Sequence, residues 1–242
     1  MFEAATGLKD KYHSGAQILG VGARPHMTRE QLQAILDVDD YDFVSIDSQH
    51  APLHEERSVD FCGMAEDLGV FVQFRIKHTR LAYMVGNYLD LGPCGVEIPL
   101  TETRDTSDEA IHHFYYPPDG GRSFGGGSRR SVGDHPDYRA YAEWWNSYGV
   151  LWLQIESPSA VLSAADLARP DVDCLSFGPT DLSANLDLHF GHELRTVDDC
   201  IVFACRSLEG SGTAVCHRNG SPDTRQKFAD MGVTVFLESA RA

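Results

Sequence analysis

Eight short apolar runs recur along this chain of 242 residues, and most are separated by segments with helical periodicity. The runs read AQILGVGA, DFVSID, VFVQFRIK, GVEIPL, VLWLQIES, CLSFGP, TAVCH and VTVFLES. Strands this apolar are typical of a parallel sheet that helices cover. Eight of them in one chain of this length predict a closed (β/α)₈ TIM barrel that forms a single domain over residues 1–242. An open doubly wound sheet is the alternative, but the first strand lacks a GxGxxG turn.

The predicted helices lie between these strands. They are expected at 28–38, 55–68, 80–91, 107–115, 138–148, 160–168, 197–208 and 224–231. The first of them begins with Thr28 and Gln31 at the spacing of a capping box. The sequence ends with LESARA directly after the last predicted strand, so we expect the final helix of the barrel to be missing.

One segment interrupts the alternation of strands and helices. Residues 116–134, YPPDGGRSFGGGSRRSVGD, form a loop rich in Gly, Pro and Ser that is longer than most connections in compact domains. Such a loop is either a functional lid or a surface excursion. Its three arginines, Arg122, Arg129 and Arg130, form a local positive cluster in an acidic chain.

Composition excludes several classes of partner. The chain has 20 Lys and Arg against 36 Asp and Glu, a net charge of −16, which argues against nucleic acid or an anionic membrane. An anionic substrate must therefore meet a local positive site. The six cysteines form no CxxC pair, which favours reduced thiols. Without a signal-peptide pattern or a membrane-length apolar run, we expect a cytoplasmic protein with small-molecule substrates.

Polar residues follow several strands where a barrel of this kind carries its chemistry, at the carboxyl ends. The candidates are Asp47, Gln49, His50, Arg75, Gln154, Glu156, Gly178, Pro179, Thr180 and Asp181. Glu156 and Asp181 offer the hard oxygen ligands that suit Mg²⁺ or Mn²⁺. Arg75 offers a bidentate fork for a carboxylate, and His50 carries an imidazole, the side chain suited to moving a proton near neutral pH.

In order along residues 20–239, the motifs FVSIDSQHAP, VQFRI, LDLGPCGVEIP, YPPDGGRS, LQIES and FGPTDLS resemble those of the HpcH/HpaI aldolases, which are metal-dependent pyruvate aldolases. The resemblance implies that Glu156 and Asp181 hold Mg²⁺, Mn²⁺ or Co²⁺, which chelates a 2-oxo acid. It further implies the roles of the other residues: Arg75 stabilises the enolate, Gln154 lies beside the metal, Gly178, Pro179 and Thr180 line the substrate site, and Asp47 and His50 form a proton-transfer dyad. Asp90 is implied to enter the site of a neighbouring subunit in a homo-oligomer of the hexamer or trimer type.

Two residues depart from the pattern of that family. Gln49 stands where glutamate is common, which removes a charge beside His50, and Gly22 stands where many relatives carry tryptophan, which widens the pocket. The sequence thus predicts a class II aldehyde-lyase that reversibly cleaves a 4-hydroxy-2-oxo acid to pyruvate, or a similar 2-oxo acid, and an aldehyde. An oxaloacetate-type decarboxylase would use the same enolate. A catalytically idle barrel that serves as a binding or scaffold protein is the alternative of another class.

Overall fold

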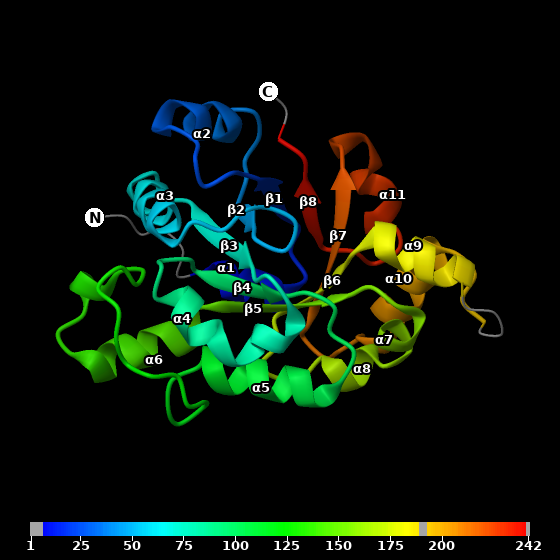
Figure 1. The fold of residues 1–242 in the computed structure, drawn as a ribbon. Helices are drawn as coiled ribbons and strands as arrows, with labels where there is room; N and C mark the ends of the chain where they lie inside the picture. Colours follow the sequence, from blue (N-terminus) through cyan, green and yellow to red (C-terminus); the bar gives the residue numbers. More distant parts are fainter. Residues whose placement is uncertain (1–6, 189–192, 241–242) are drawn as a thin grey trace.

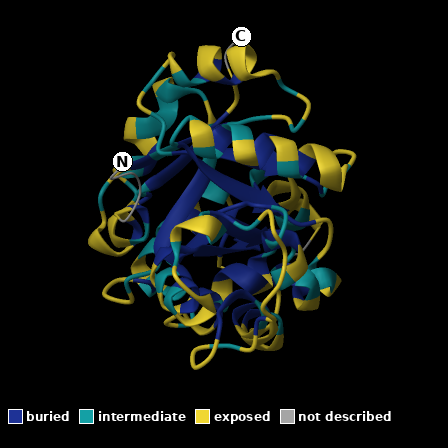
Figure 2. Ribbon diagram, turned by 90° about the vertical axis from the view of Figure 1, so that its left-hand side faces the viewer, coloured by how far each residue is buried: buried dark blue, intermediate teal, exposed yellow. Residues whose placement is uncertain are grey.

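The computed structural model describes residues 7–188 and 193–240. Its eight strands are all parallel and close into a barrel, with β8 paired to β1 (Figure 1). The strands are β1 (Ile18–Gly22), β2 (Phe43–Asp47), β3 (Phe71–Arg75), β4 (Gly95–Ile98), β5 (Val150–Ile155), β6 (Cys174–Phe177), β7 (Ala214–Gly220) and β8 (Val235–Glu238). This confirms the predicted (β/α)₈ barrel. Figure 2 shows the strands buried and the surrounding helices exposed on their outer sides.

The helices that surround the barrel agree with the prediction in position more than in extent. They are α1 (Leu8–Ser14), α2 (Arg29–Leu36), α3 (Glu55–Asp67), α4 (Val85–Leu89), α5 (Arg104–Phe114), α6 (Tyr138–Tyr148), α7 (Pro158–Leu162), α8 (Ala164–Leu167), α9 (Pro179–Leu188), α10 (Val197–Ser207) and α11 (Arg225–Ala229), with short 3₁₀ turns η1 (Thr79–Met84), η2 (Val132–Asp134) and η3 (Pro222–Thr224). The capping box of Thr28 and Gln31 forms as predicted.

Two predicted helices are divided, a third is shorter than predicted, and two helices were not predicted. The segment 80–91 divides into η1 and α4, 160–168 divides at Ser163, and 224–231 begins with a 3₁₀ turn. The helices α1 and α9 were not predicted. The expected absence of a helix after β8 concerns residues that extend outside the described range. No described helix has the length and apolar character needed to cross a membrane.

The register of the strands sorts the inside of the barrel into layers. Asp47, Arg75 and Glu97 are paired in register on β2, β3 and β4, so these polar side chains lie at one level near the carboxyl ends. Deeper in the barrel the rings of Phe43 and Trp152 meet edge to face, 5.4 Å between centroids. The barrel is thus polar at its carboxyl end, which we call the mouth, and aromatic below.

The short helix α1 covers the opposite end of the barrel. Its Tyr12 packs edge-on against Trp152, with centroids 6.0 Å apart. Lys9 and His13 both reach the buried carboxylate of Asp173, at 3.0 and 2.8 Å. The hydrogen bond to Asp173 raises the pKa of His13, which strengthens the attachment of α1.

The loop 116–134 lies in the connection from α5 to β5, and such connections lie at the amino ends of barrel strands. It is therefore no lid over the mouth of its own chain. Its arginines are also not a free positive cluster. Arg122 is buried against Asp90 at 2.9 Å, Arg130 pairs with Glu66 at 3.3 Å, and Arg129 donates to the hydroxyl of Tyr116 at 3.0 Å.

We predict that Gly95→Ala destabilises the barrel, because the added Cβ would lie 2.0 Å from Oε1 of Gln73 and 2.5 Å from the carbonyl oxygen of Val150. Overpacking of this kind costs about 1–3 kcal/mol. The control is Gly63→Ala on α3, where a Cβ has open space, and this change should stabilise by about 0.5–1 kcal/mol. Urea unfolding measures both changes. Equal stabilities would contradict the packing argument.

Candidate active site

An arginine–carboxylate pair anchors the mouth of the barrel. Nε and Nη2 of Arg75 donate to the two carboxylate oxygens of Asp47, at 2.8 and 2.6 Å, and Nη1 donates to Oε1 of Gln154 at 3.2 Å. Because β4 separates β3 from β5, the bond from Arg75 to Gln154 runs inside the barrel. Burial alone would raise the pKa of Asp47, but the hydrogen bonds and charge of Arg75 outweigh burial and lower it.

His50 lies apart from this pair, at the rim. It is exposed, three residues beyond the end of β2. In addition to the hydrogen bonds from Arg75, Asp47 accepts one from the backbone N–H of Gln49 at 2.8 Å. Within the described range, the structure gives Asp47 and His50 no hydrogen bond to each other, so their proton-transfer dyad stays a prediction.

Glu156 follows β5 directly, and its neighbours enclose its side chain closely. Its side chain is buried, and Oε2 accepts the backbone N–H of Leu100 at 3.0 Å. Leu100 has a φ of 50°, a left-handed conformation that side chains rarely adopt and that aims this N–H at the carboxylate. A Cβ on Gly178 would lie 2.2 Å from Oε1 of Glu156, so only glycine leaves room for the carboxylate.

The electrostatics around Glu156 favour a cation. Burial, with the nearby charges of Asp181 and Glu97 adding to it, raises the pKa of Glu156 to about 7 against the opposing N–H of Leu100. Asp181 is exposed in the first turn of α9, and Asn185 of that helix donates to the carbonyl oxygen of Glu156 at 2.9 Å. A buried carboxylate whose charge is disfavoured by burial and by a second carboxylate nearby suits a divalent ion. In the part of the chain that the structure describes, no three His, Cys, Asp or Glu side chains form a ready metal cage.

A second polar network crosses the mouth, and its residues are not among the candidates identified from the sequence. The buried carboxylate of Glu97 on β4 accepts hydrogen bonds from the hydroxyl of Ser176 on β6 and from Nη2 of Arg218 on β7. Alternation along GVEIPL and TAVCHRNG could have indicated it, since Glu97 and Arg218 share their faces with residues that point inward. What the sequence alone could not show is that the two side chains meet across the barrel.

The family model described as HpcH/HpaI aldolase/citrate lyase matches residues 25–237. This chain belongs to the HpcH/HpaI family. A hydroxypyruvate/pyruvate aldolase of Delftia acidovorans is 29% identical over 204 residues, covering 82% of this chain and 73% of the relative. A 4-hydroxy-2-oxovalerate aldolase of Rhodococcus jostii is 26% identical over 204 residues, covering 81% and 75%.

Solved structures of HpcH/HpaI proteins share the barrel. The HpcH/HpaI aldolase of Desulfitobacterium hafniense superposes with a TM-score of 0.82 at 23% identity, over 96% of this chain and 90% of that one. Macrophomate synthase superposes with a TM-score of 0.77 at 21% identity, over 96% and 82%. At these identities the structures support the fold alone.

The remaining predicted residue of this HpcH/HpaI protein lies at the other end of the barrel. Asp90 follows α4, before β4 begins, so it is remote from the mouth of its own chain. There Asp90 accepts a hydrogen bond from Nη2 of Arg122. A Cβ added to Gly126 would lie 2.7 Å from the Cβ of Asp90. Asp90 is thus packed against the loop 116–134, and its role in a neighbouring subunit stays a prediction.

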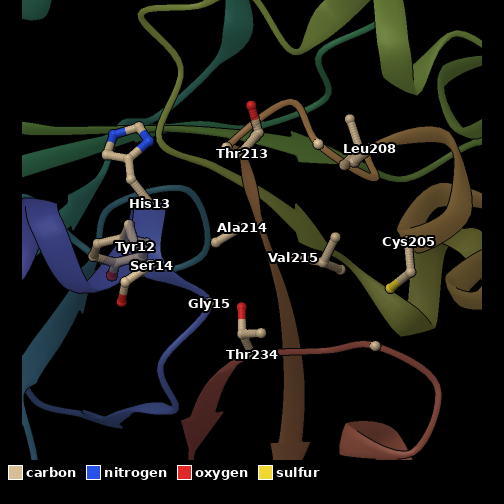
Figure 3. Close-up of a pocket in the computed structure, with 13 residues that line it drawn as sticks. Tyr12, His13, Ser14, Gly15, Cys205, Leu208, Thr213, Ala214, Val215 and Thr234 are labelled. Carbon is tan, nitrogen blue, oxygen red and sulfur yellow. The ribbon is translucent and has the colours of Figure 1, made fainter.

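A cavity also lies at that amino end, between α1, the end of α10 and the start of β7 (Figure 3). Tyr12, His13, Thr213 and Ala214 are among its lining residues. None of the site residues predicted from the sequence lines it. The cavity therefore adds nothing to the candidate site at the mouth.

We predict that Gly178→Ala displaces the carboxylate of Glu156 and weakens Mn²⁺ binding at least about tenfold, as loss of support for a metal ligand typically does. Gly133→Ala in the loop 116–134 is the control, because a Cβ there meets nothing within 4 Å. Titration of Mn²⁺ by calorimetry measures both affinities. Equal affinities for the two variants would show that Glu156 needs no such space.

Proposed function

We propose that this protein is a metal-dependent carbon–carbon lyase that cleaves a 4-hydroxy-2-oxo acid to pyruvate, or a similar 2-oxo acid, and an aldehyde. Membership of the HpcH/HpaI family and the named aldolase activities of its relatives support this class of reaction. The observation that carries the proposal is the buried carboxylate of Glu156, held by Leu100 and Gly178 beside a second carboxylate. Glu156 and Asp181 would hold Mg²⁺, Mn²⁺ or Co²⁺.

The bound ion would supply a Lewis acid that draws negative charge onto the keto oxygen of the 2-oxo acid. Arg75 adds a fixed positive charge, because Asp47 and Gln154 hold its guanidinium in one orientation. A donor that is already oriented before charge develops is what stabilises such a transition state. Gly178, Pro179 and Thr180, at the start of α9, would line the place of the 2-oxo acid.

In cleavage, the C4 hydroxyl loses its proton, the bond between C3 and C4 breaks, and the electron pair of that bond forms the enolate. The aldehyde leaves, and C3 then takes up a proton to give the 2-oxo acid. His50 is exposed at the rim and has the chemistry to move these protons. No external oxidant or reductant is required.

We further propose that the protein works as a homo-oligomer in which Asp90 serves the site of a neighbouring subunit. What supports this is its position, at the end of the barrel opposite the mouth of its own chain. In its own chain Asp90 has the buried guanidinium of Arg122 as its partner, which would fix its direction.

The first prediction concerns the ion. A chelator should abolish hydrogen–deuterium exchange at C3 of pyruvate, and Mn²⁺ or Mg²⁺ should restore it. Glu156→Gln keeps the shape of the side chain but removes its charge, so exchange should fall more than about 100-fold. Glu143→Gln on the exposed face of α6 is the matched control. Full exchange in the presence of chelator would refute metal dependence, and no exchange under any condition would favour an idle barrel.

The second prediction concerns Arg75. Lysine carries the charge but cannot hold both oxygens of Asp47 and reach Gln154, so Arg75→Lys should lower kcat/KM for aldol cleavage about 10²–10³-fold. The exposed Arg57→Lys on α3 is the control for loss of an arginine as such. An unchanged kcat/KM for Arg75→Lys would remove this residue from the mechanism. Release of CO₂ from oxaloacetate, assayed in parallel, distinguishes the decarboxylase alternative.

A further inference from the structure

Arg218 extends across the inside of the barrel mouth. It lies on β7 and donates through Nη2 to Glu97 on β4, and two strands, β5 and β6, separate these elements. The side chain of Glu97 is fully buried, whereas that of Arg218 is 23% exposed. Glu97 thus anchors the guanidinium from below, and Arg218 lies on the solvent side of the pair.

Arg75 and Arg218 differ in how their guanidinium nitrogens are used. All three guanidinium nitrogens of Arg75 donate to Asp47 or Gln154. In contrast, Nε of Arg218 is buried and has no hydrogen-bond partner among the residues that the structure describes. A buried N–H donor without an acceptor is costly. Because Nε belongs to a positively charged guanidinium, an anionic acceptor suits it best.

The position of Arg218 fits the second substrate and not the 2-oxo acid. This step rests on the proposed function. The 2-oxo acid would lie between Glu156 and Asp181, after β5 and β6, and Arg75 on β3. The strands that this arrangement leaves for a second substrate include β7. Gly22 on β1 leaves room there, because a Cβ at this position would meet only the carbonyl oxygen of Glu238, at 3.6 Å.

We propose that Arg218 is a specificity-determining residue that binds an anionic group, such as a carboxylate, on the aldehyde partner, and that Glu97 is the residue that positions it. A chain with a net charge of −16 repels anions in general, so an anionic partner needs a local cation of this kind. In the direction of synthesis, C3 of the 2-oxo acid loses a proton and bonds to the aldehyde carbon. The aldehyde oxygen gains a proton, and the carboxylate of the aldehyde takes no part in bond making.

The test compares two aldehydes of two carbons each, with pyruvate as the donor. Glyoxylate carries a carboxylate where glycolaldehyde carries a hydroxymethyl group. The readout is the ratio of kcat/KM for glyoxylate to that for glycolaldehyde within each protein, so a general loss of activity cancels. Arg218→Met alone would leave the buried Glu97 without its counter-charge and could prevent folding. The comparison is therefore between Glu97→Gln and the double variant Glu97→Gln/Arg218→Met.

We expect Glu97→Gln to keep the ratio of the wild type, because the amide oxygen of glutamine can still accept the hydrogen bond from Nη2 of Arg218 and hold the guanidinium in place. The double variant should lower the ratio about 10- to 100-fold, the worth of one charge-assisted hydrogen bond. A ratio in the double variant within about threefold of that in Glu97→Gln would overturn the role of Arg218 and leave the proposed function in place. If the wild type shows neither product nor hydrogen–deuterium exchange in pyruvate, the proposed function and this inference both fail.

Discussion

Closure of the barrel is the constraint on which the rest of this structure depends. Once β8 pairs with β1, alternate side chains of every strand are directed into one narrow space, and residues far apart in the sequence become neighbours. Arg75 meets Gln154 in this way, and Glu97 meets Arg218. An open sheet with the same strands would leave these groups on separate parts of its surface.

The interior of the mouth is crowded with charge, and each charge has a compensating partner nearby. Asp47 faces Arg75, and Glu97 faces Arg218. The acidic pair of Glu156 and Asp181 is the exception, because the charge of Asp181 adds to burial in raising the pKa of Glu156, and the N–H of Leu100 and the charge of Arg75 offset this only in part. The uncompensated charge of this pair thus lies where the proposed ion would bind.

Features that depend on residues close together in the sequence could be predicted from it, whereas contacts between residues far apart in the sequence could not. Short apolar runs located all eight strands, and the carboxyl ends of those strands located Arg75, Gln154, Glu156 and Gly178, which the structure does bring to one mouth. The partner of Asp47 was harder to predict, because His50 is close in sequence while Arg75 is close in register. The helix α1 lies outside the repeating β/α pattern. Residues far away in the sequence, such as Asp173, hold it in place, so no local sequence pattern indicated it. The loop 116–134 looked like a lid only because its length gives no information on which end of the barrel it occupies.

The helix α1 has a consequence for the order of events in catalysis. Phe43 and Trp152 fill the barrel below the mouth and α1 covers its amino end, so small molecules would reach the proposed site and leave it through the mouth alone. Of two molecules that enter and leave through the same opening, the one bound deeper enters first and departs last. If the 2-oxo acid binds against Glu156 and the aldehyde toward the rim, as proposed, the architecture would give an ordered kinetic scheme in which the aldehyde is the first product released.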